Sequence, residues 1–348
     1  MSTHAEARKV QRVAASGFGF IMLYTSIPNT FLKPSVLSLG VAEHGSSISV
    51  EESWKMLDAY AEAGGNMADT AHVYAAWLPE GKGQSERTLG QWIRSRQAQT
   101  FLVATKGGHP DLATMDISRL SPDDIARDID QSLERLQLDS IDLLYLHRDD
   151  PQIPVNEIMD ALNTHVASGR VRALGASNWS SARIAQANEY ASKRDLTGFC
   201  ISQIGWSLAQ VNPDVRGAGL TIQMDDELLA WHRQSGFPIA AYSSQANGFF
   251  AYPLPDSQQD SKNWTDKQKS LAHSYLNPRN SARHDCASRM STHVGRTPNE
   301  IALAYIWSQS FPSIAIIGPR RLEPLQDSLR AGALRLSPDA VAQLETAD

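Results

Sequence analysis

Four side chains with acid–base chemistry each lie at, or just after, the end of a short apolar run. They are Asp69, Tyr74, Lys106 and His147. A phenol has a pKa of about 10, so it donates a proton efficiently at neutral pH only when a cation lies beside it. Lys106 can be that cation, Asp69 can hold Lys106 in place, and His147 can donate a hydrogen bond to a substrate oxygen. Together the four could protonate a carbonyl oxygen while its carbon accepts a hydride.

None of these side chains carries hydride, so this chemistry requires a cofactor, and later runs end in residues that could bind one. Asn178 and Gln203 combine donors and acceptors that suit a carboxamide, and Tyr242 offers a flat face for a nicotinamide ring. The candidates for binding phosphate are Ser243, Ser244, Arg320 and Arg321. The two arginines precede a predicted helix, whose N-terminus also favours anions.

The elements that must position these residues alternate between strand and helix. Strands are predicted at 36–39, 66–69, 101–105, 141–146, 171–176, 199–203, 238–242 and 313–317. Helices are predicted at 50–63, 85–96, 155–168, 180–193, 301–310 and 322–331, with others that begin near 121 and 337 or end near 235. Eight strand-then-helix units favour an α/β fold that closes into a (β/α)8 TIM barrel. An open sheet would usually carry a Gly-rich phosphate turn after its first strand, and Gly40–Gly45 supplies none.

Residues 1–348 are interpreted as a single barrel domain with two irregular segments. The apolar stretch 17–24 is too short to span a bilayer, and we expect 1–34 to form an N-terminal arm or hairpin. The range 247–279 is rich in Pro, Ser, Asp and Gln. We expect it to be a long loop at the C-terminal face of the barrel, and therefore a possible lid.

Composition excludes several other classes of protein. The chain has 348 residues and a net charge of −6, which argues against nucleic acid as a partner. Cys200 and Cys286 are the two cysteines, too few for a disulfide framework, which suits a reducing cytoplasm. His and acid ligands are not clustered outside the four residues above, so no metal site is expected. No membrane association is expected either, and a homo-oligomer stays open.

A set of motifs in fixed order carries a resemblance to a known family. The motifs are Asp69-Thr-Ala-His-Val-Tyr74, Gly83-Gln-Ser-Glu86, Ala104-Thr-Lys-Gly107, Tyr145-Leu-His147, Gly175-Ala-Ser-Asn178, Gln203-Ile-Gly-Trp-Ser-Leu208, Ala241-Tyr-Ser243 and Ile316-Ile-Gly-Pro-Arg320. With them the chain resembles the aldo-keto reductase family from about residue 35 to about residue 335. Any one motif alone is weak, whereas the ordered set is specific.

The resemblance implies an NADPH-dependent reductase with a catalytic tetrad of Asp69, Tyr74, Lys106 and His147, in which Tyr74 is the general acid. It implies an extended cofactor whose carboxamide contacts Ser177, Asn178 and Gln203 and whose ring stacks on Tyr242. The family's adenine-phosphate site maps onto Gly318, Arg320, Arg321, Gln326 and Ser328. The sequence departs from the usual pattern at Pro319 and Pro324, which makes a preference for NADPH over NADH less secure than the tetrad.

The substrate is predicted from the loops that would line the pocket. The expected lining residues are Trp77, His109, Arg148, Trp179 and Trp206. Aromatic faces beside hydrogen-bonding groups suit a polyhydroxylated ligand, so we expect a sugar aldehyde or ketone. The stretches 74–86 and 147–150 are also similar to a bacterial branch associated with sugar catabolism, which includes reductases of oxidised hexoses such as 6-dehydroglucose.

Other readings of the same residues stay open. The chain could be a general aldehyde reductase without a sugar preference, or a nonenzymatic NADPH-binding regulatory subunit. Lys106 could form a Schiff base in an aldolase, or Asp69 and Lys106 could be only a structural ion pair. A glycosidase is disfavoured because the seventh strand ends in Tyr242-Ser243 and not in a carboxylate.

Overall fold

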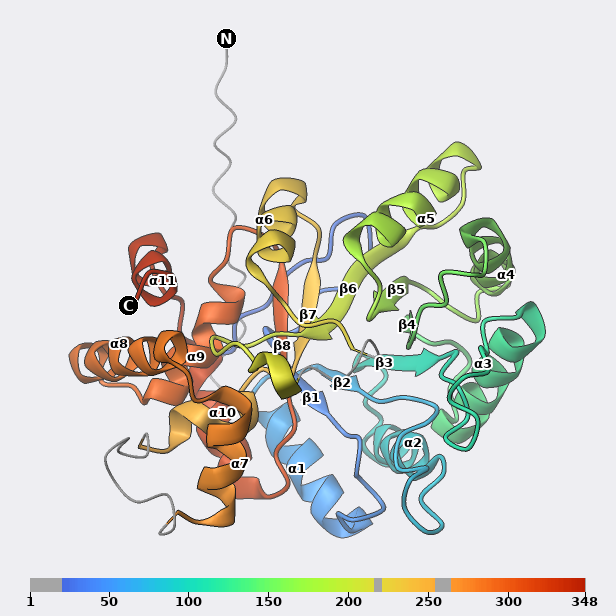
Figure 1. Ribbon diagram of the computed structural model, residues 1–348. Helices are drawn as coiled ribbons and strands as arrows, with labels where there is room; N and C mark the ends of the chain where they lie inside the picture. Colours follow the sequence, from blue (N-terminus) through green and yellow to red (C-terminus); the bar gives the residue numbers. More distant parts are fainter. Residues whose placement is uncertain (1–20, 216–220, 254–263, 348) are drawn as a thin grey trace, which may run out of the picture.

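Eight parallel strands close into a barrel in chain order, and helices surround it (Figure 1). The computed structural model describes residues 21–215, 221–253 and 264–347. The last strand pairs with the first, with Leu37 opposite Ala315 and Leu39 opposite Ile317. The predicted (β/α)8 barrel is therefore confirmed.

The strands lie close to their predicted positions. They are β1 Leu37–Gly40, β2 Met67–Asp69, β3 Leu102–Gly107, β4 Leu143–Leu146, β5 Leu174–Ser177, β6 Phe199–Gly205, β7 Ile239–Tyr242 and β8 Ser313–Ile317. The strands β4 and β5 begin after the predicted starts at 141 and 171, and β3 and β6 end after the predicted ends at 105 and 203. Ile141 and Val171 still pair with each other as an isolated parallel bridge.

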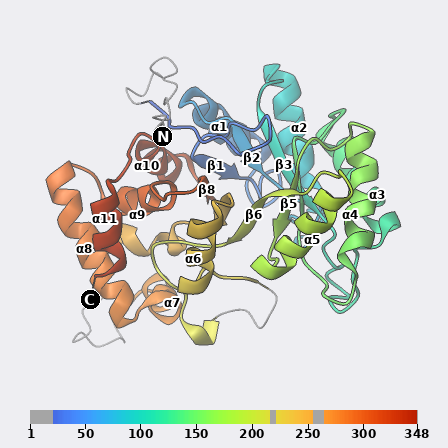
Figure 2. The same cartoon turned by 90° about the horizontal axis from the view of Figure 1, so that it is seen from above.

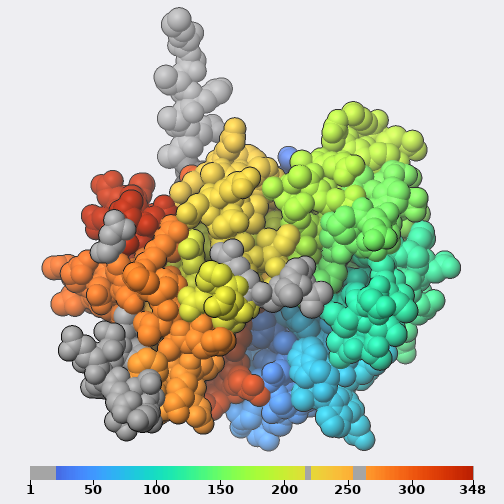
Figure 3. All heavy atoms as spheres, in the orientation of Figure 1, coloured from blue at the N-terminus to red at the C-terminus, as the bar shows by residue number. Residues whose placement is uncertain are grey.

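Helices follow the strands on the outside of the barrel, as the view from above shows (Figure 2). They are α1 Val50–Glu62, α2 Gln84–Arg96, α3 Pro122–Leu136, α4 Val155–Ala167, α5 Ser181–Lys193, α6 Asp226–Ser235, α7 Asp266–Tyr275, α8 Pro278–Val294, α9 Pro298–Trp307, α10 Leu322–Ala331 and α11 Pro338–Glu345. In the space-filling view, α8 and α11 lie on the opposite side of the molecule from α2, α3 and α4 (Figure 3). None of the helices in the described ranges is long and apolar enough to cross a membrane.

Local sequence explains where several helices begin. The Ser121 hydroxyl accepts a hydrogen bond from the Asp124 amide, and Pro122 follows it at the first helical position of α3. Thr297 and Glu300 form a reciprocal capping box at the start of α9. Both patterns satisfy amides that a helix N-terminus leaves without partners.

Apolar side chains fill the barrel interior, so the barrel is a packed core and not a pore. The buried interior cluster consists of Ile27, Leu32, Met67, Ala104, Leu143, Tyr145, Ala173, Ile201, Ala240, Ile314 and Ile316. Two members, Ile27 and Leu32, come from the segment that precedes β1. There the Ile27 amide donates to the Leu32 carbonyl at 3.0 Å, and Tyr24 pairs with Ser35 in an antiparallel bridge. Residues 24–35 thus form a turn-back segment whose apolar side chains join the interior cluster.

The segment predicted as one long loop at 247–279 contains regular structure. A 3-10 segment runs from Ala246 to Ala251, and α7 occupies Asp266–Tyr275. Helix α7 was not predicted from the sequence because it is mostly polar: only Leu271 and Tyr275 are buried. The structure does not describe residues 254–263, where part of the proposed lid lies.

Helices α2 and α3 approach closely at Gly90, which provides a test of the packing. A methyl group added at Gly90 would lie 2.1 Å from the Leu136 carbonyl oxygen. Alanine gains about 1 kcal/mol in helix propensity, but overpacking against backbone costs about 1–3 kcal/mol. We therefore expect Gly90→Ala to lower the free energy of unfolding, measured with urea.

The matched control is Gly318→Ala, because nothing lies within 4 Å of its added methyl group. Its stability should stay close to that of the wild type. A Gly90→Ala protein as stable as this control would show that the approach of α2 to α3 is not tight.

Candidate active site

A buried ion pair lies at the carboxyl ends of two neighbouring strands, β2 and β3. Lys106 is 1% exposed and Asp69 is 2% exposed. The Lys106 Nζ atom lies 2.5 Å from Asp69 Oδ1 and also donates to the Thr70 carbonyl at 2.8 Å and to the Tyr74 hydroxyl at 3.0 Å. These three acceptors match the three hydrogens of an ammonium group. Because Lys106 donates to Tyr74, the phenol keeps its own hydrogen available for another acceptor.

The second oxygen of Asp69 is bound from across the barrel. Gln203 in β6 donates through Nε2 to Asp69 Oδ2 at 2.8 Å. The sequence predicted Gln203 only as a cofactor ligand, and this second role was missed. The signal was nevertheless present, because side chains at the ends of opposite strands converge when a small barrel closes.

Burial and charge set the protonation of three candidate catalytic groups, Tyr74, Lys106 and His147. Burial raises the pKa of Tyr74, while the Lys106 ammonium opposes that rise. Burial alone would lower the pKa of Lys106, but Asp69 and Tyr74 outweigh it and the pKa is raised. The pKa of His147 lies well below its ordinary value, because of burial first and then because of the nearby Lys106 cation. At neutral pH the site therefore holds a phenol, an ammonium and a neutral imidazole.

The imidazole of His147 stands beside the phenol. The rings of Tyr74 and His147 have centroids 5.8 Å apart and an interplanar angle of 81°. The Nδ1 atom of His147 is buried and has no hydrogen-bond partner among the described residues. A bare nitrogen costs less there than an unpaired N–H, so we assign the hydrogen to Nε2. That tautomer gives His147 an N–H with which to bind a substrate oxygen.

The residues predicted to hold a carboxamide and a ring lie together. Asn178 has a left-handed φ of 59°, which turns the chain just after β5. Its side-chain oxygen accepts from the Tyr242 hydroxyl at 2.8 Å and from the Ile222 amide at 3.0 Å. Its backbone amide donates to the Gln203 carbonyl at 3.0 Å, and its side-chain nitrogen donates to Ser177 Oγ at 3.2 Å. The structure thus brings all four predicted residues to one side of the mouth.

The residues predicted to bind phosphate differ in what they offer. Ser243 is exposed with a φ of 53°. Ser244 is buried and donates to the Ile316 carbonyl at 2.6 Å. Buried Ser328 donates to the Pro324 carbonyl at 2.8 Å and accepts from Gln245 at 3.0 Å. The hydroxyls of Ser244 and Ser328 are therefore used within the protein, whereas Ser243 is accessible.

The segment between β8 and α10 is open to solvent. Gly318 is exposed and Arg321 is the exposed N-cap residue of α10, without a side-chain cap bond. Arg320 is 65% exposed and pairs with Glu43 Oε2 at 2.6 Å. Gln326 is half-buried one turn into α10. The predicted phosphate ligands therefore surround an accessible helix N-terminus, but one of the two arginines already has a carboxylate partner.

Three of the five predicted substrate ligands lie near the tetrad. Trp77 is 50% exposed and contacts the Tyr74 ring edge-to-face at 6.3 Å. The ring of His109 lies 4.8 Å from the ring of His147. Burial raises the pKa of Tyr74 and of Tyr242, and the Arg148 charge opposes both rises, so the guanidinium lies near both phenols.

The other two predicted substrate ligands, Trp179 and Trp206, are buried. Trp179 is 1% exposed, donates to the Arg148 carbonyl at 3.1 Å and packs against Phe199. Trp206 is 5% exposed and stacks on Phe311. Both indoles belong to the packing between barrel and helices. Each follows the end of a strand, where the backbone turns and strand alternation no longer predicts the direction of a side chain.

No group of three or more His, Cys, Asp or Glu side chains suited to a metal ion occurs in the described part of the chain.

Comparisons with known proteins agree with this geometry. A family model described as "Aldo/keto reductase family" matches residues 36–348. The chain is similar to "Uncharacterized oxidoreductase YrpG" of Bacillus subtilis, with 27% identity over 93% of this chain and 95% of that protein. It is also similar to a "Norsolorinic acid reductase" of Emericella nidulans, with 27% identity over 91% of this chain and 79% of that protein.

Two further proteins extend the comparison. "Probable aryl-alcohol dehydrogenase" of Saccharomyces cerevisiae is 27% identical over 86% of this chain and 88% of that protein. A crystal structure of a thermostable aldo-keto reductase with the inhibitor epalrestat superposes with a TM-score of 0.68 at 22% identity, covering 94% of this chain and all of that one. The structural likeness shows a shared fold.

The buried ion pair generates a stability prediction. Lys106→Met leaves the Asp69 carboxylate buried without its cation, which costs about 3–5 kcal/mol of unfolding free energy. Lys106→Met combined with Asp69→Asn removes both charges, so it should recover much of that loss. Urea denaturation of both variants measures the difference. An unfolding free energy of Lys106→Met within about 0.5 kcal/mol of the wild-type value would contradict the pairing of Lys106 with Asp69.

Proposed function

The chain belongs to the aldo/keto reductase family, and on that premise we propose that it reduces a carbonyl to an alcohol with NADPH. One observation carries the proposal: Lys106 donates at once to Asp69 and to the Tyr74 hydroxyl, in a site that also contains a neutral His147. This arrangement prepares a phenol to give up a proton and a second donor to hold the receiving oxygen.

The open end of the barrel has side chains that fit a dinucleotide. Asn178, Gln203 and Tyr242 would hold the nicotinamide end, since Asn178 accepts from the Tyr242 hydroxyl and its backbone amide donates to the Gln203 carbonyl. At the other end, nothing lies within 4 Å of a Cβ added at Gly318, so a phosphate can approach the backbone there. Arg321 and the first turn of α10 would bind it. When bound, NADPH supplies the hydride.

The protein's own part of the reaction is proton transfer and orientation. His147 donates from Nε2 to the substrate carbonyl oxygen, which fixes that oxygen next to the Tyr74 hydroxyl. As negative charge develops on the oxygen, the Tyr74 hydroxyl transfers its proton there. The Lys106 ammonium, 3.0 Å away, stabilises the phenolate that remains. Asp69 keeps Lys106 charged and aimed.

The geometry disfavours the aldolase alternative. A Schiff base requires an uncharged lysine amine, but the pKa of Lys106 is raised and its three hydrogens have three acceptors. The same contacts support turnover over a purely regulatory subunit, because a site that only binds a nucleotide needs no acid paired with a cation.

We favour NADPH over NADH because Arg321 stands exposed at the N-cap of α10, where a 2′-phosphate could be bound. The ion pair of Arg320 with Glu43 opposes part of that preference, since the carboxylate repels a phosphate.

For the substrate, we propose an aromatic aldehyde or ketone first. The prediction of a sugar depended partly on Trp179 and Trp206, which are core residues. The exposed indole of Trp77 beside Tyr74 suits an aromatic ring, and one relative is named as an aryl-alcohol dehydrogenase. A sugar carbonyl is the second candidate, because His109 and Arg148 near the site can bind hydroxyl groups.

Tyr74→Phe tests the proposed general acid. We expect kcat to fall by at least roughly 10²-fold, because the proton donor is lost, while the Kd for NADPH measured by fluorescence stays within about twofold of the wild type. Unchanged turnover would remove Tyr74 from the mechanism. Loss of NADPH binding as well would show that the ring mainly shapes the cofactor site.

A substrate panel tests the substrate class and the cofactor together. Aromatic aldehydes, aromatic ketones and sugar carbonyls are compared by kcat/KM from the oxidation of NADPH and, separately, of NADH. We expect the highest values for aromatic carbonyls with NADPH, and a lower value for them in Trp77→Ala. A higher kcat/KM for a sugar carbonyl would reverse the order of the two candidates.

A further inference from the structure

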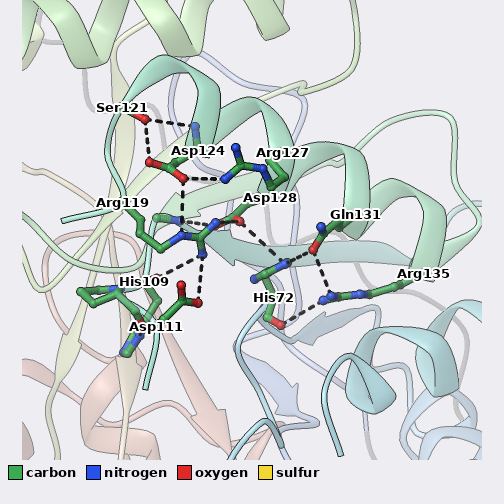
Figure 4. A network of polar contacts seen from close by, with 12 residues as sticks. His72, His109, Asp111, Arg119, Ser121, Asp124, Arg127, Asp128, Gln131 and Arg135 are labelled. Atoms are coloured by element: carbon green, nitrogen blue, oxygen red, sulfur yellow. Dashed lines mark hydrogen bonds and ion pairs between the residues drawn. The ribbon is translucent and has the colours of Figure 1, made fainter. Parts of the chain in front are cut away.

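The two loops that carry His72 and His109 contact one polar face of α3 (Figure 4). That face consists of Asp128, Gln131 and Arg135, which are spaced by three and four residues and therefore project from the same side of the helix. The loop after β2 carries Tyr74, and the loop after β3 carries His109. The network includes none of the four tetrad side chains.

Arg135 binds the β2 loop and a buried acid together. Its Nη1 atom donates to the His72 carbonyl at 3.0 Å and to Glu86 Oε2 at 3.1 Å, and its Nη2 atom donates to Gln131 Oε1 at 3.2 Å. Glu86 is fully buried, and its other oxygen accepts from the Thr105 hydroxyl at 2.7 Å. Thr105 immediately precedes Lys106. One guanidinium thus connects the loop of the general acid to the strand of its cation.

His72 is held at its backbone and at its ring. Its amide donates to the Lys106 carbonyl at 2.9 Å and its carbonyl accepts from Arg135. Its ring nitrogen Nε2 lies 2.7 Å from Gln131 Oε1. Tyr74 comes two residues later, so a shift of His72 would change the distance from the phenol to the ammonium.

Asp128 holds the neighbouring loop in the same way. Its Oδ2 atom accepts from the Gly108 amide at 2.9 Å, and its Oδ1 atom accepts from Arg119 at 2.5 Å. Arg119 also donates to the His109 carbonyl at 3.4 Å. The ring of His109 contacts the ring of His147 edge-to-face. The same helix face therefore supports the loop of Tyr74 and the loop whose histidine contacts His147.

A set of buried ions is an expensive way to gain stability. Desolvation offsets much of the attraction, and apolar packing of similar volume is often as stable. Three hydrogen bonds of this network instead hold backbone atoms of the two loops, namely the His72 carbonyl, the Gly108 amide and the His109 carbonyl. We propose that the polar face of α3, and Arg135 foremost, positions Tyr74 against Lys106 for proton transfer. This inference rests on the proposed function, since Arg135 is a positioning residue that acts through Tyr74.

The test removes the cation and its acid together, because Arg135→Met alone would leave Glu86 buried and unpaired. In Glu86→Gln/Arg135→Met the new amide oxygen can still accept from Thr105. We expect kcat per NADPH-binding site to fall by roughly 10- to 100-fold, as for a catalytic group misplaced by about 1 Å. The Kd for NADPH should be unchanged. The matched control is Arg127→Met, which removes a 56% exposed arginine of the same helix that pairs with Asp124, and its kcat should match the wild type.

A double-mutant cycle with Tyr74→Phe separates positioning from a general structural role. If Arg135 acts through Tyr74, adding Glu86→Gln/Arg135→Met to Tyr74→Phe causes no further loss of kcat. An equal fold loss with and without the phenol would overturn the inference, as would an unchanged kcat in the Glu86→Gln/Arg135→Met protein.

Amide hydrogen exchange gives a readout without turnover. Exchange of residues 70–78 should be faster in Glu86→Gln/Arg135→Met than in the wild type and in Arg127→Met. If the wild type turns over no carbonyl, the proposed function fails. Faster exchange in this loop would still support the inference that the polar face of α3 holds the loop of Tyr74 in place. Unchanged exchange would overturn it.

Discussion

The site depends on one constraint: an ammonium and a carboxylate must be kept together inside a barrel that excludes water. Lys106 and Asp69 are almost fully buried, so each would be severely destabilised without the other. Their separation is set by the pairing of β2 with β3, in which Asp69 lies opposite Ala104, two residues before Lys106. Closure of the barrel adds Gln203 from β6 as a third member. The register of the strands therefore determines the geometry of the site.

Charge in this interior also determines what the surrounding groups can do. The Lys106 cation opposes the effect of burial on Tyr74 and adds to the effect of burial on His147. One side chain thereby limits the rise that burial causes in the pKa of the phenol and adds to the fall that burial causes in the pKa of the imidazole. Beneath it, the face of α3 holds the backbone of the two loops without entering the site. Acid strength and loop position are thus controlled by separate sets of residues.

Much of this arrangement could be predicted from the sequence, for physical reasons that differ by element. Parallel strands that are buried on both sides leave continuous apolar runs, so the eight strands and the residues at their ends were found. The predicted approach of Asp69, Tyr74, Lys106 and His147 to one another is observed, because strand ends point into one mouth. Helix α7 was missed because only Leu271 and Tyr275 mark its buried side. The burial of Trp179 and Trp206 was not predicted, because the chain turns just before them. The contact of Gln203 with Asp69 was not predicted, because it joins residues that are far apart in sequence.

The segment before β1 has a consequence for how Tyr74 would regain its proton after each reaction cycle. Ile27 and Leu32 belong to the apolar cluster that fills the barrel interior, and such a packed interior is not a path for water. In the proposed reaction, a proton lost from Tyr74 would then return from the open mouth of the barrel, where the substrate would also enter. Reprotonation of Tyr74 would consequently depend on release of the product from the mouth of the barrel. The slower of these two steps could limit turnover.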